Sequence, residues 1–398
     1  MLNSYAYSFC TFGVPKMSRL RRPLLVIISI VSALNLWPVL SASIELNTLP
    51  DDYLSDTYTE LIREAKPGWW GNWSLSKSVE VGAIGVVGHD STFNPSGLRL
   101  NNLSITVSPL SEKLKVSTQH VLGPNVFSTN TATGSAEASA QVTLKWEFSA
   151  KGAMSAQWIL AEEQHLSNSA DSINTNMEFL KSVAREMNML NPLTGEISQG
   201  FGIITAVILA KSGVNLASVS DSAEWSISGE GKGLQSMLGN AKASASYSSA
   251  ESSSNIVSIL WPATPNEVTD ELVPVAYTFA SIHGETVIPL WVEKINDFEL
   301  IFKNHSSYIV IATATYHTQG GREEKQTKIS GFLQGSIGDI PLDATSLELK
   351  LEFIGSLPYT ALHNSWNTPL GTWLTGKRHI DIWGLWPDHP SFTIQEEE

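Results

Sequence analysis

A single cysteine, Cys10, occurs among the 398 residues, and it precedes every segment that we expect to fold. The rest of the chain therefore has no thiol for a disulfide or for a thiolate zinc site. Packing must supply the stability, and the 42% of hydrophobic residues is enough for one large core or two smaller ones. We expect a globular chain that no covalent crosslink holds together.

The first 43 residues have the order of a secretory signal peptide. A basic stretch, residues 16–22, precedes the apolar run 23–31, and the small-residue site 41–43 follows. Met17 is an alternative start that gives a leader of conventional length. A membrane anchor is disfavoured, because Asn35 and Pro38 interrupt the apolar run before it reaches the roughly 20 residues of a spanning helix. We expect a secreted, extracellular protein.

The chain is acidic, with 25 Lys and Arg, 39 Asp and Glu and a formal net charge of −14. All the charged residues of the predicted leader are basic, so its removal makes the net charge of the remaining chain more negative. Nucleic acid is excluded as a partner class, because phosphate binding depends on a cationic surface. Recruitment to anionic lipid by charge alone is excluded for the same reason.

Turn signals divide the chain into an α+β domain, residues 44–285, and a β-sandwich domain, residues 286–398. The proline-containing and acidic stretch 262–271 marks the boundary region. We predict an α+β fold that is mostly β, with a twisted antiparallel sheet in the first domain. Short strands spaced by Gly and Pro predict the sandwich; they lie at 298–302, 308–316, 326–333, 347–353 and 378–383.

One long helix is predicted over residues 169–190, where Ile173, Met177 and Leu180 recur at helical spacing and a proline follows. A second helix is expected over 156–166. The aliphatic run 200–210 favours a strand, with a buried helix as the alternative. Clean alternation over 142–148 and a short apolar run over 256–261 predict two further strands.

Four of the 13 tryptophans fall between Trp366 and Trp386. Tryptophan is favoured where one edge of the ring is apolar and the indole N–H meets water, as on sugar platforms and at lipid headgroups. Trp366, Trp373 and Trp386 lie in segments rich in turn-forming residues and are our candidate membrane- or ligand-binding residues. Trp383 lies in a predicted strand and is expected to be buried. The alternative is that the whole group fills the sandwich core.

Two tracts of small residues, 128–141 and 241–255, are unusual. Alternating Ala and Ser can line water on one face of a strand and a less polar medium on the other, and such tracts resemble the membrane-inserting hairpins of β-pore-forming proteins. The alternative is a solvated edge strand or a Ser-rich loop. The candidate inserting residues are Ala136, Ala138, Ala243, Ser244, Ala245, Ser246 and Tyr247.

Residues 300–390 resemble the C-terminal β-sandwich of the cholesterol-dependent cytolysins. The resemblance rests on the extended strand 308–316, Gly331, the Ile-Pro-Leu segment 340–347, Trp366 and the closing Ile-Trp-Gly strand 380–384, in the family's order. The chain lacks the family's cysteine-bearing, Trp-rich undecapeptide. More loosely, residues 65–285 resemble the pore-forming domain of gasdermins. These resemblances imply a cytolysin-like toxin that binds membranes through its sandwich.

No catalytic residue, metal site or cofactor is predicted. The nine histidines form no HExxH pair, and no GxSxG nucleophile elbow occurs. A secreted hydrolase stays open as an alternative, because any two of the 39 acidic residues could form its catalytic carboxylate pair. Three acceptor sequons, at Asn72, Asn102 and Asn304, indicate a glycoprotein if the source glycosylates.

The leading hypothesis is therefore a secreted pore-forming protein whose C-terminal sandwich binds a lipid membrane or a cell-surface glycan. Assembly of several copies on the membrane is compatible with it. The alternative is a secreted carbohydrate-binding or adhesive sandwich, and a secreted hydrolase ranks third.

Overall fold

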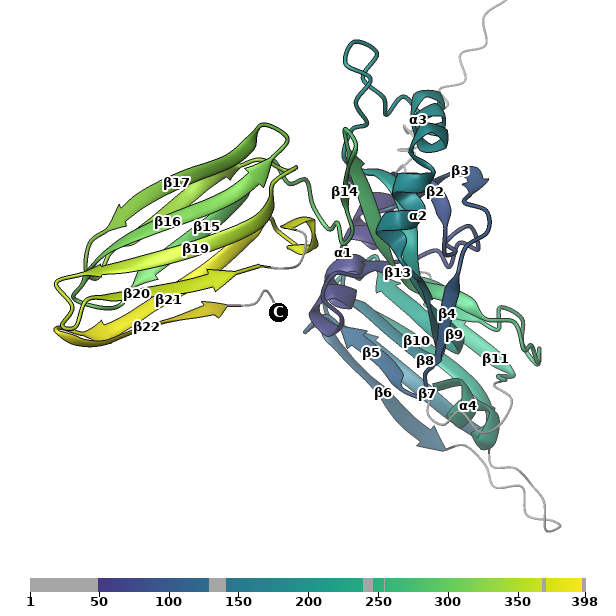
Figure 1. The fold of residues 1–398 in the computed structure, drawn as a ribbon. Helices are drawn as coiled ribbons and strands as arrows, with labels where there is room; N and C mark the ends of the chain where they lie inside the picture. The colour runs from purple at the N-terminus through teal and green to yellow at the C-terminus, as the bar shows by residue number, and fades with distance from the viewer. Residues whose placement is uncertain (1–48, 129–140, 239–245, 254, 367–369, 396–398) are drawn as a thin grey trace, which may run out of the picture. The chain divides into compact units, whose positions relative to one another are not determined.

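The computed structural model describes residues 49–128, 141–238, 246–253, 255–366 and 370–395. Strands make up 54% of the structure and helices 12%. This confirms the α+β, mostly β fold, with antiparallel sheets in the first part of the chain and a sandwich in the second (Figure 1). The predicted leader, residues 1–43, lies outside the described residues, and the domain boundary at 285/286 stays a prediction.

Three long strands form the centre of the largest sheet: β8 (Met154–Leu166), β9 (Phe201–Ser218) and β13 (Val273–His283). β9 is buried along almost its whole length and pairs with β2, β8, β12 and β13. Its aliphatic run has elements on both faces, so it shows no polar alternation. The other strands of this sheet are β1 (Trp70–Gly71), β2 (Ala83–Val87), β3 (Phe93–Arg99), β4 (Ile105–Pro109), β5 (Lys113–Ser117), β12 (Ile256–Trp261) and β14 (Thr286–Ile288).

The helix predicted over residues 156–166 is wrong, because this segment is part of strand β8. β8 pairs with β9 along one edge and with β4 and β5 along the other. Residues 154–160 are all buried, so the segment has neither the alternation of a half-buried strand nor the stripe of an amphipathic helix. Pairing on both edges overrides its local helix propensity.

The helix predicted over 169–190 is present as two shorter ones, α2 (Ser169–Thr175) and α3 (Met177–Glu186). Asn176 separates them, and its side-chain amide donates to the carbonyl of Ser172 at 2.8 Å, a bond that competes with helix continuation. Helix α1 (Asp51–Ala65), which the sequence analysis did not predict, packs Leu54, Tyr58 and other apolar side chains into a core of its own against the sheet.

A second, four-stranded sheet has the order β11 (Ser249–Ser252), β10 (Ala223–Glu230), β7 (Gln141–Phe148) and β6 (Val121–Ser128). Trp146 and Trp225 lie directly opposite each other on β7 and β10, with ring centroids 5.2 Å apart, and both are fully buried. The opposite face carries Lys145, Glu147 and Glu224. The helix α4 (Gly231–Leu238) follows β10, and its Leu234 belongs to the same core.

The C-terminal strands form two four-stranded sheets that share one core. The first sheet has the order β18 (Gln334–Ile340), β15 (Phe298–Asn304), β21 (Lys377–Leu385) and β22 (Asp388–Gln395). The second has the order β17 (Gly321–Ile329), β16 (Ile309–Thr318), β19 (Thr345–Ile354) and β20 (Thr360–Ser365). Alternate residues of both sheets point into the core, as the predicted strand pattern requires.

Candidate functional site

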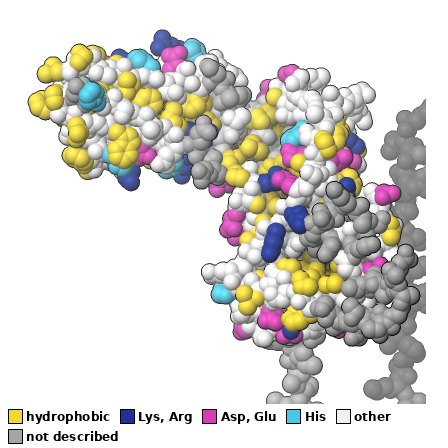
Figure 2. Space-filling model, turned by 90° about the horizontal axis from the view of Figure 1, so that it is seen from below, with side chains coloured by type: hydrophobic (Ala, Val, Ile, Leu, Met, Phe, Trp, Pro, Cys, Tyr) yellow, Lys and Arg dark blue, Asp and Glu magenta, His cyan; other side chains and the backbone are white. Residues whose placement is uncertain are grey.

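Four loops meet at one end of the sandwich. They join β15 to β16, β17 to β18, β19 to β20 and β21 to β22. Together they expose a set of large apolar side chains that we call the apolar tip: Ile309, Phe332, Leu333, Ile354, Leu357, Tyr359, Trp383, Leu385 and Trp386. Figure 2 shows hydrophobic and histidine side chains gathered over this end, at the left of the view.

Backbone hydrogen bonds hold the tip loops against one another. The N–H of Phe332 donates to the carbonyl of Ser306 at 3.0 Å, and the N–H of Leu357 donates to the carbonyl of Pro387 at 2.9 Å. The indole N–H of Trp386 donates to the carbonyl of Gly355 at 2.9 Å. The exposed side chains therefore stand on a connected backbone, although Leu357 is 68% exposed and Leu385 is 81% exposed.

Buried polar groups fix the loop between β15 and β16. Asn304 is 2% exposed, and its amide donates to the carbonyls of Tyr308 at 2.9 Å and of Ser330 at 3.2 Å. Its side-chain oxygen accepts from the N–H and the hydroxyl of Ser306, at 2.9 and 2.6 Å. The hydroxyl of Tyr308 donates to the carbonyl of Leu385 at 3.2 Å. Asn304 thus joins two of the tip loops, and Tyr308 reaches a third.

The tip carries little charge. Its loops, residues 305–309, 330–334, 354–360 and 383–390, contain no Lys or Arg. Loop 383–390 contains one acidic residue, Asp388. In loop 305–309, the ring nitrogen Nε2 of His305 lies 2.7 Å from Oδ1 of Asp381 on β21, and the His305 ring stacks on Trp383 with centroids 4.0 Å apart. An apolar surface without Lys or Arg suits a medium that is less polar than water.

The structure separates the predicted tryptophans. Trp386 is 62% exposed and belongs to the apolar tip. Trp373 is fully buried beside Phe298 and half-buried Trp366, with ring centroids 5.8 and 5.5 Å away. The expectation that Trp373 decorates an exposed loop is wrong, because the short helix η1 (Leu370–Thr372) returns the chain to the core. Trp366 packs against the same core and lies outside the tip.

Trp383 is also placed differently from the prediction. It lies on β21 as expected, but it is 45% exposed. Ile380 and Ile382 take the inward positions of this strand, so alternation turns Trp383 outward. The prediction that Trp383 is buried is therefore wrong.

In two of the three sequons, the asparagine side chain is buried and hydrogen-bonded within the fold. Asn72 is 5% exposed, and its amide donates to the carbonyls of Pro274 and Ser76 at 2.8 and 3.1 Å. Asn304 is buried in the network described above. In the folded protein both amide nitrogens are thus occupied and shielded from modification. Asn102 is exposed, and its glycosylation stays a prediction.

The connections β6–β7 and β10–β11, which overlap the two small-residue tracts, leave one sheet at the same end. Gln141 of β7 pairs with Glu230 of β10, and Val142 pairs with Ser128 of β6. On the other side, Ser228 of β10 pairs with Ser249 of β11. The connections β6–β7 and β10–β11 therefore leave the same end of this sheet. Most of the candidate inserting residues, Ala136, Ala138, Ala243, Ser244 and Ala245, lie outside the described residues.

Tyr247, also a candidate inserting residue, is 4% exposed in this structure. Its hydroxyl donates to the carbonyl of Ala263 at 2.8 Å, and its own carbonyl accepts from the N–H of Asn266 at 2.7 Å. Burial raises the pKa of the Tyr247 phenol, with nearby Glu267 adding to the effect. Ser246, the preceding candidate, is half-buried. The end of the second tract is therefore anchored in the fold.

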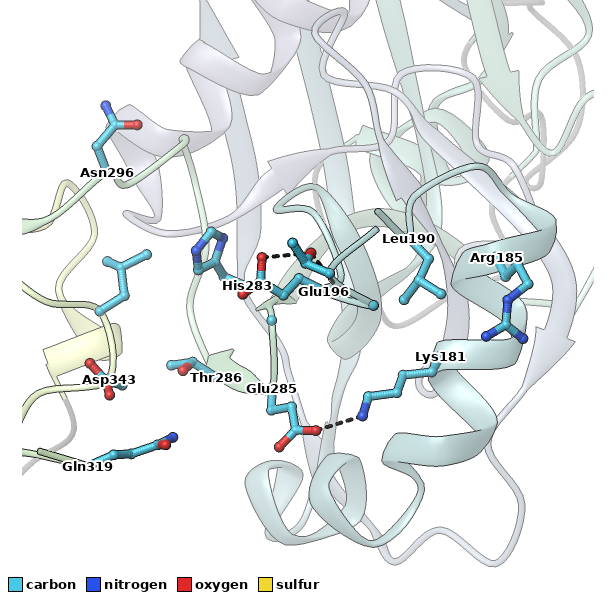
Figure 3. A pocket seen from close by; sticks show the side chains of 14 residues that line it. Lys181, Arg185, Leu190, Glu196, His283, Glu285, Thr286, Asn296, Gln319 and Asp343 are labelled. Atoms are coloured by element: carbon cyan, nitrogen blue, oxygen red, sulfur yellow. Dashed lines mark hydrogen bonds and ion pairs between the residues drawn. The ribbon is translucent and has the colours of Figure 1, made fainter. Parts of the chain in front are cut away.

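A pocket of about 680 Å³ has a polar wall that includes α3 and the β13–β14 turn (Figure 3). Lys181 on this wall donates to Glu285 at 2.6 Å and to Glu178 at 3.2 Å. The hydrogen bond with Lys181 lowers the pKa of Glu285. Thr194 donates to Glu196 at 2.9 Å. These carboxylates are thus paired with neighbouring side chains of the same wall.

Among the described residues, no group of three or more His, Cys, Asp or Glu side chains is arranged to hold a metal ion. Within the same residues, no helix combines the length and the apolar character that crossing a membrane requires.

The sequence analysis missed most of the apolar tip. Phe332, Leu333, Leu357, Tyr359 and Leu385 were not singled out. Leu357, Tyr359 and Leu385 stand beside Gly or Pro, as in Leu357-Pro358-Tyr359. Phe332 and Leu333 fall at the end of the strand predicted over 326–333, but β17 ends at Ile329 and both residues lie in the turn before β18. Large apolar residues at turns between alternating strands were the available signal, since turns lie at the surface.

No protein-family model matches the chain, and no curated protein matches it. Among solved structures, the cytotoxin suilysin from Streptococcus suis aligns with a TM-score of 0.21 and 13% identity, over 64% of this chain and 60% of suilysin. The membrane pore complex of pneumolysin aligns with a TM-score of 0.20 and 10% identity, over 73% of this chain and 69% of pneumolysin.

A disulfide-locked mutant of intermedilysin with human CD59 also aligns, with a TM-score of 0.20 and 9% identity, over 73% of this chain and 68% of intermedilysin. The chain spans 60% of the length of suilysin. At TM-scores of 0.20–0.21 these alignments support no conclusion about fold or function.

Proposed function

We propose that this protein is a secreted, cytolysin-like protein that binds lipid membranes through its apolar tip and then inserts the two small-residue tracts as transmembrane hairpins. The observation that carries the proposal is the tip itself. Phe332, Leu357, Leu385 and Trp386 are between 62% and 81% exposed at one end of one sandwich. Exposed apolar patches on soluble proteins mark partner or membrane contacts.

The size of the tip suits reversible adsorption. Burying one large apolar side chain contributes roughly 1.5–3 kcal/mol, so three of them supply about 4–9 kcal/mol. A free energy of about 4 kcal/mol corresponds to millimolar binding and about 8 kcal/mol to micromolar binding. Trp386 and Tyr359 add aromatic rings with polar edges, which favour the headgroup region. The tip can therefore hold the protein at a bilayer surface without a spanning helix.

The insertion step is supported by the sheet that carries both tracts. β7 and β10 are neighbours, and the connections that follow β6 and β10 leave the same end. Two hairpins that extend these four strands would therefore lie side by side and could pair directly. Extended pairing satisfies the backbone polar groups, which is the requirement for any segment inside hydrocarbon.

Binding and insertion are tested separately with vesicles of phosphatidylcholine and sterol. Co-sedimentation measures binding, and release of an enclosed dye between about pH 5 and 8 measures insertion. We expect Leu385→Ala to weaken binding by roughly tenfold, because the leucine contributes about 1.5–3 kcal/mol when buried. Leu193→Ala is the matched control, since Leu193 is 94% exposed and lies outside the tip; its binding should equal that of the wild type.

Each result decides a different part of the proposal. Equal binding by Leu385→Ala and the wild type would reject the apolar tip as the membrane contact. Binding without dye release at micromolar protein would reject insertion and keep docking. Recognition of immobilised glycans without any binding to vesicles would instead select the carbohydrate-binding alternative.

A further inference from the structure

We infer that His305 and Asp381 are positioning residues that fix the Trp383 ring at the apolar tip, an inference that rests on the proposed membrane docking for its function. The motivating contact is the stack between His305 and Trp383. Their ring centroids are 4.0 Å apart and their planes differ by 9°. The imidazole therefore covers one face of an indole that is otherwise 45% exposed.

Asp381 holds the imidazole in place. This carboxylate is 8% exposed, and its Oδ1 accepts a hydrogen bond from Nε2 of His305 at 2.7 Å. Its Oδ2 accepts from the side-chain amide of Gln395 on β22. The His305 backbone N–H donates to the carbonyl of Ile382 at 2.8 Å. Main chain and side chain of His305 are thus both tied to β21, the strand that carries Trp383.

The arrangement constrains an exposed ring that packing alone would leave free. A surface tryptophan has two rotatable side-chain bonds, and holding it in one rotamer without partners has an entropic cost. Here the imidazole occupies one face, and the buried carboxylate stops the imidazole from swinging away. The remaining face and edge of Trp383 are then presented in one orientation. A preorganised contact binds more tightly, because less freedom is lost on docking.

Several other ionisable side chains of β15 and β21 share this outer face. Lys303 of β15 is the register partner of Asp381, His379 precedes Asp381 by two residues on β21, and Lys377 and its register partner Glu299 lie farther along the same face. Lys303 and His379 are both exposed. His379→Gln therefore serves as a matched control, since it removes a histidine from the same strand and leaves the stack intact.

The experiment uses the full chain labelled with 5-fluorotryptophan and observed by ¹⁹F NMR. The Trp383 resonance is assigned by its loss in Trp383→Phe. A stacked imidazole changes the magnetic environment of the indole, so this resonance reports the contact between His305 and Trp383. We expect His379→Gln to keep the wild-type position of the resonance and His305→Phe, which keeps a ring but loses the bond to Asp381, to move it.

Asp381→Asn provides a second variant, because it keeps the size of the side chain and removes the charge. We expect its Trp383 resonance to move from the wild-type position while the other tryptophan resonances stay in place, which also shows that the variant is folded. Vesicle binding by Asp381→Asn and by His305→Phe should be about three- to tenfold weaker than that of the wild type.

A Trp383 resonance with the wild-type position in His305→Phe would overturn the positioning role. Unchanged vesicle binding in both variants, with altered resonances, would overturn its importance for docking. Because the NMR measurement is made without lipid, failure of the wild type to bind vesicles would count against the proposed docking alone.

Discussion

Asn304 shows how one side chain organises the apolar tip. Its amide and its side-chain oxygen make four hydrogen bonds in a position that is 2% exposed. Asn304→Ala removes the side-chain partner of the carbonyl of buried Tyr308 and of the N–H and hydroxyl of buried Ser306. Each buried group left unsatisfied costs about 1–3 kcal/mol. We expect Asn304→Ala to lower the free energy of unfolding in urea by about 2–4 kcal/mol. Asn102→Ala, at an exposed sequon, should change this value by less than about 0.5 kcal/mol.

Trp373 and Trp386 should separate stability from binding. Trp373 is fully buried, so Trp373→Ala should cost about 3–5 kcal/mol of unfolding free energy and leave vesicle binding per folded molecule unchanged. Trp386→Ala should weaken vesicle binding by roughly tenfold. Its cost in stability should be about 1 kcal/mol, because only the bond from its indole to Gly355 is lost. If Trp373→Ala weakened vesicle binding and Trp386→Ala lowered the unfolding free energy by several kcal/mol, Trp373 would be assigned to the membrane contact and Trp386 to the core.

At the residue scale, the sequence identifies candidate binding residues but does not determine whether each side chain is buried or exposed. Trp373 and Trp386 both lie in segments rich in turn-forming residues, yet Trp373 is buried and Trp386 is exposed. The difference comes from η1, which folds residues 370–372 back onto the core. Asn72 and Asn304 match an acceptor motif, but tertiary partners that are distant in sequence, such as Pro274 for Asn72, occupy their amides. No local pattern contains that information.

Among the elements, the connection from β10 to β11 is anchored at Tyr247. Tyr247→Phe removes the hydrogen bond to Ala263, which contributes about 1 kcal/mol. We expect backbone amides of residues 246–248 to exchange about fivefold faster with deuterium, and dye release to be faster by a similar factor if this segment must detach for insertion. Tyr316→Phe, which loses a bond to Glu323 in the sandwich, is the control and should change neither rate. Unchanged exchange in Tyr247→Phe would mean that this hydroxyl does not restrain the segment.

Helix α3 is joined to the β13–β14 turn by an ion pair that predicts a pH effect. Lys181 lowers the pKa of Glu285 below its ordinary value of 4.5. A depressed carboxyl pKa stabilises the fold above the unfolded-state pKa, and this contribution is lost as the pH falls through the folded-state value. We expect Glu285→Gln to have a lower melting temperature than the wild type at pH 7 and an equal one near pH 3. Glu196→Gln is the control, and a difference that persists at pH 3 would assign the effect to packing.

Element types followed from periodicity where one face of the element is exposed. The alternating segments 142–148 and 347–353 are strands, as predicted. Periodicity failed for β8, whose residues 154–160 are buried on both faces. Strand pairing with β4, β5 and β9 decides its state, and those partners are distant in sequence. The break at Asn176 depends on a single side-chain hydrogen bond, which apolar spacing does not report.

For the molecule as a whole, composition was a reliable guide. A chain without cysteine after residue 10 and with strands spaced by turns was expected to hold its sheets by packing, and the described sheets share extensive apolar cores. The apolar tip was less accessible to prediction, because it is assembled from four loops between residues 305 and 390. Their proximity is a property of the sandwich topology, which brings alternate strand ends together.

Overall charge and the tip predict which membranes this protein prefers. The chain has a formal net charge of −14, and the tip loops contain no Lys or Arg. Anionic lipid should therefore repel the protein, while the apolar contribution of the tip is independent of lipid charge. We expect binding to phosphatidylcholine vesicles to weaken by about tenfold when 30% phosphatidylserine is added, roughly 1.4 kcal/mol of repulsion.

Salt distinguishes this account from specific recognition of a headgroup. At about 1 M salt the screening length is about 3 Å, so binding to the anionic vesicles should recover toward the value for neutral ones. Binding to neutral vesicles should change little, because few charges lie at the contact. Stronger binding to phosphatidylserine at low salt would contradict the prediction, since it would require a cationic contact that the tip loops do not contain.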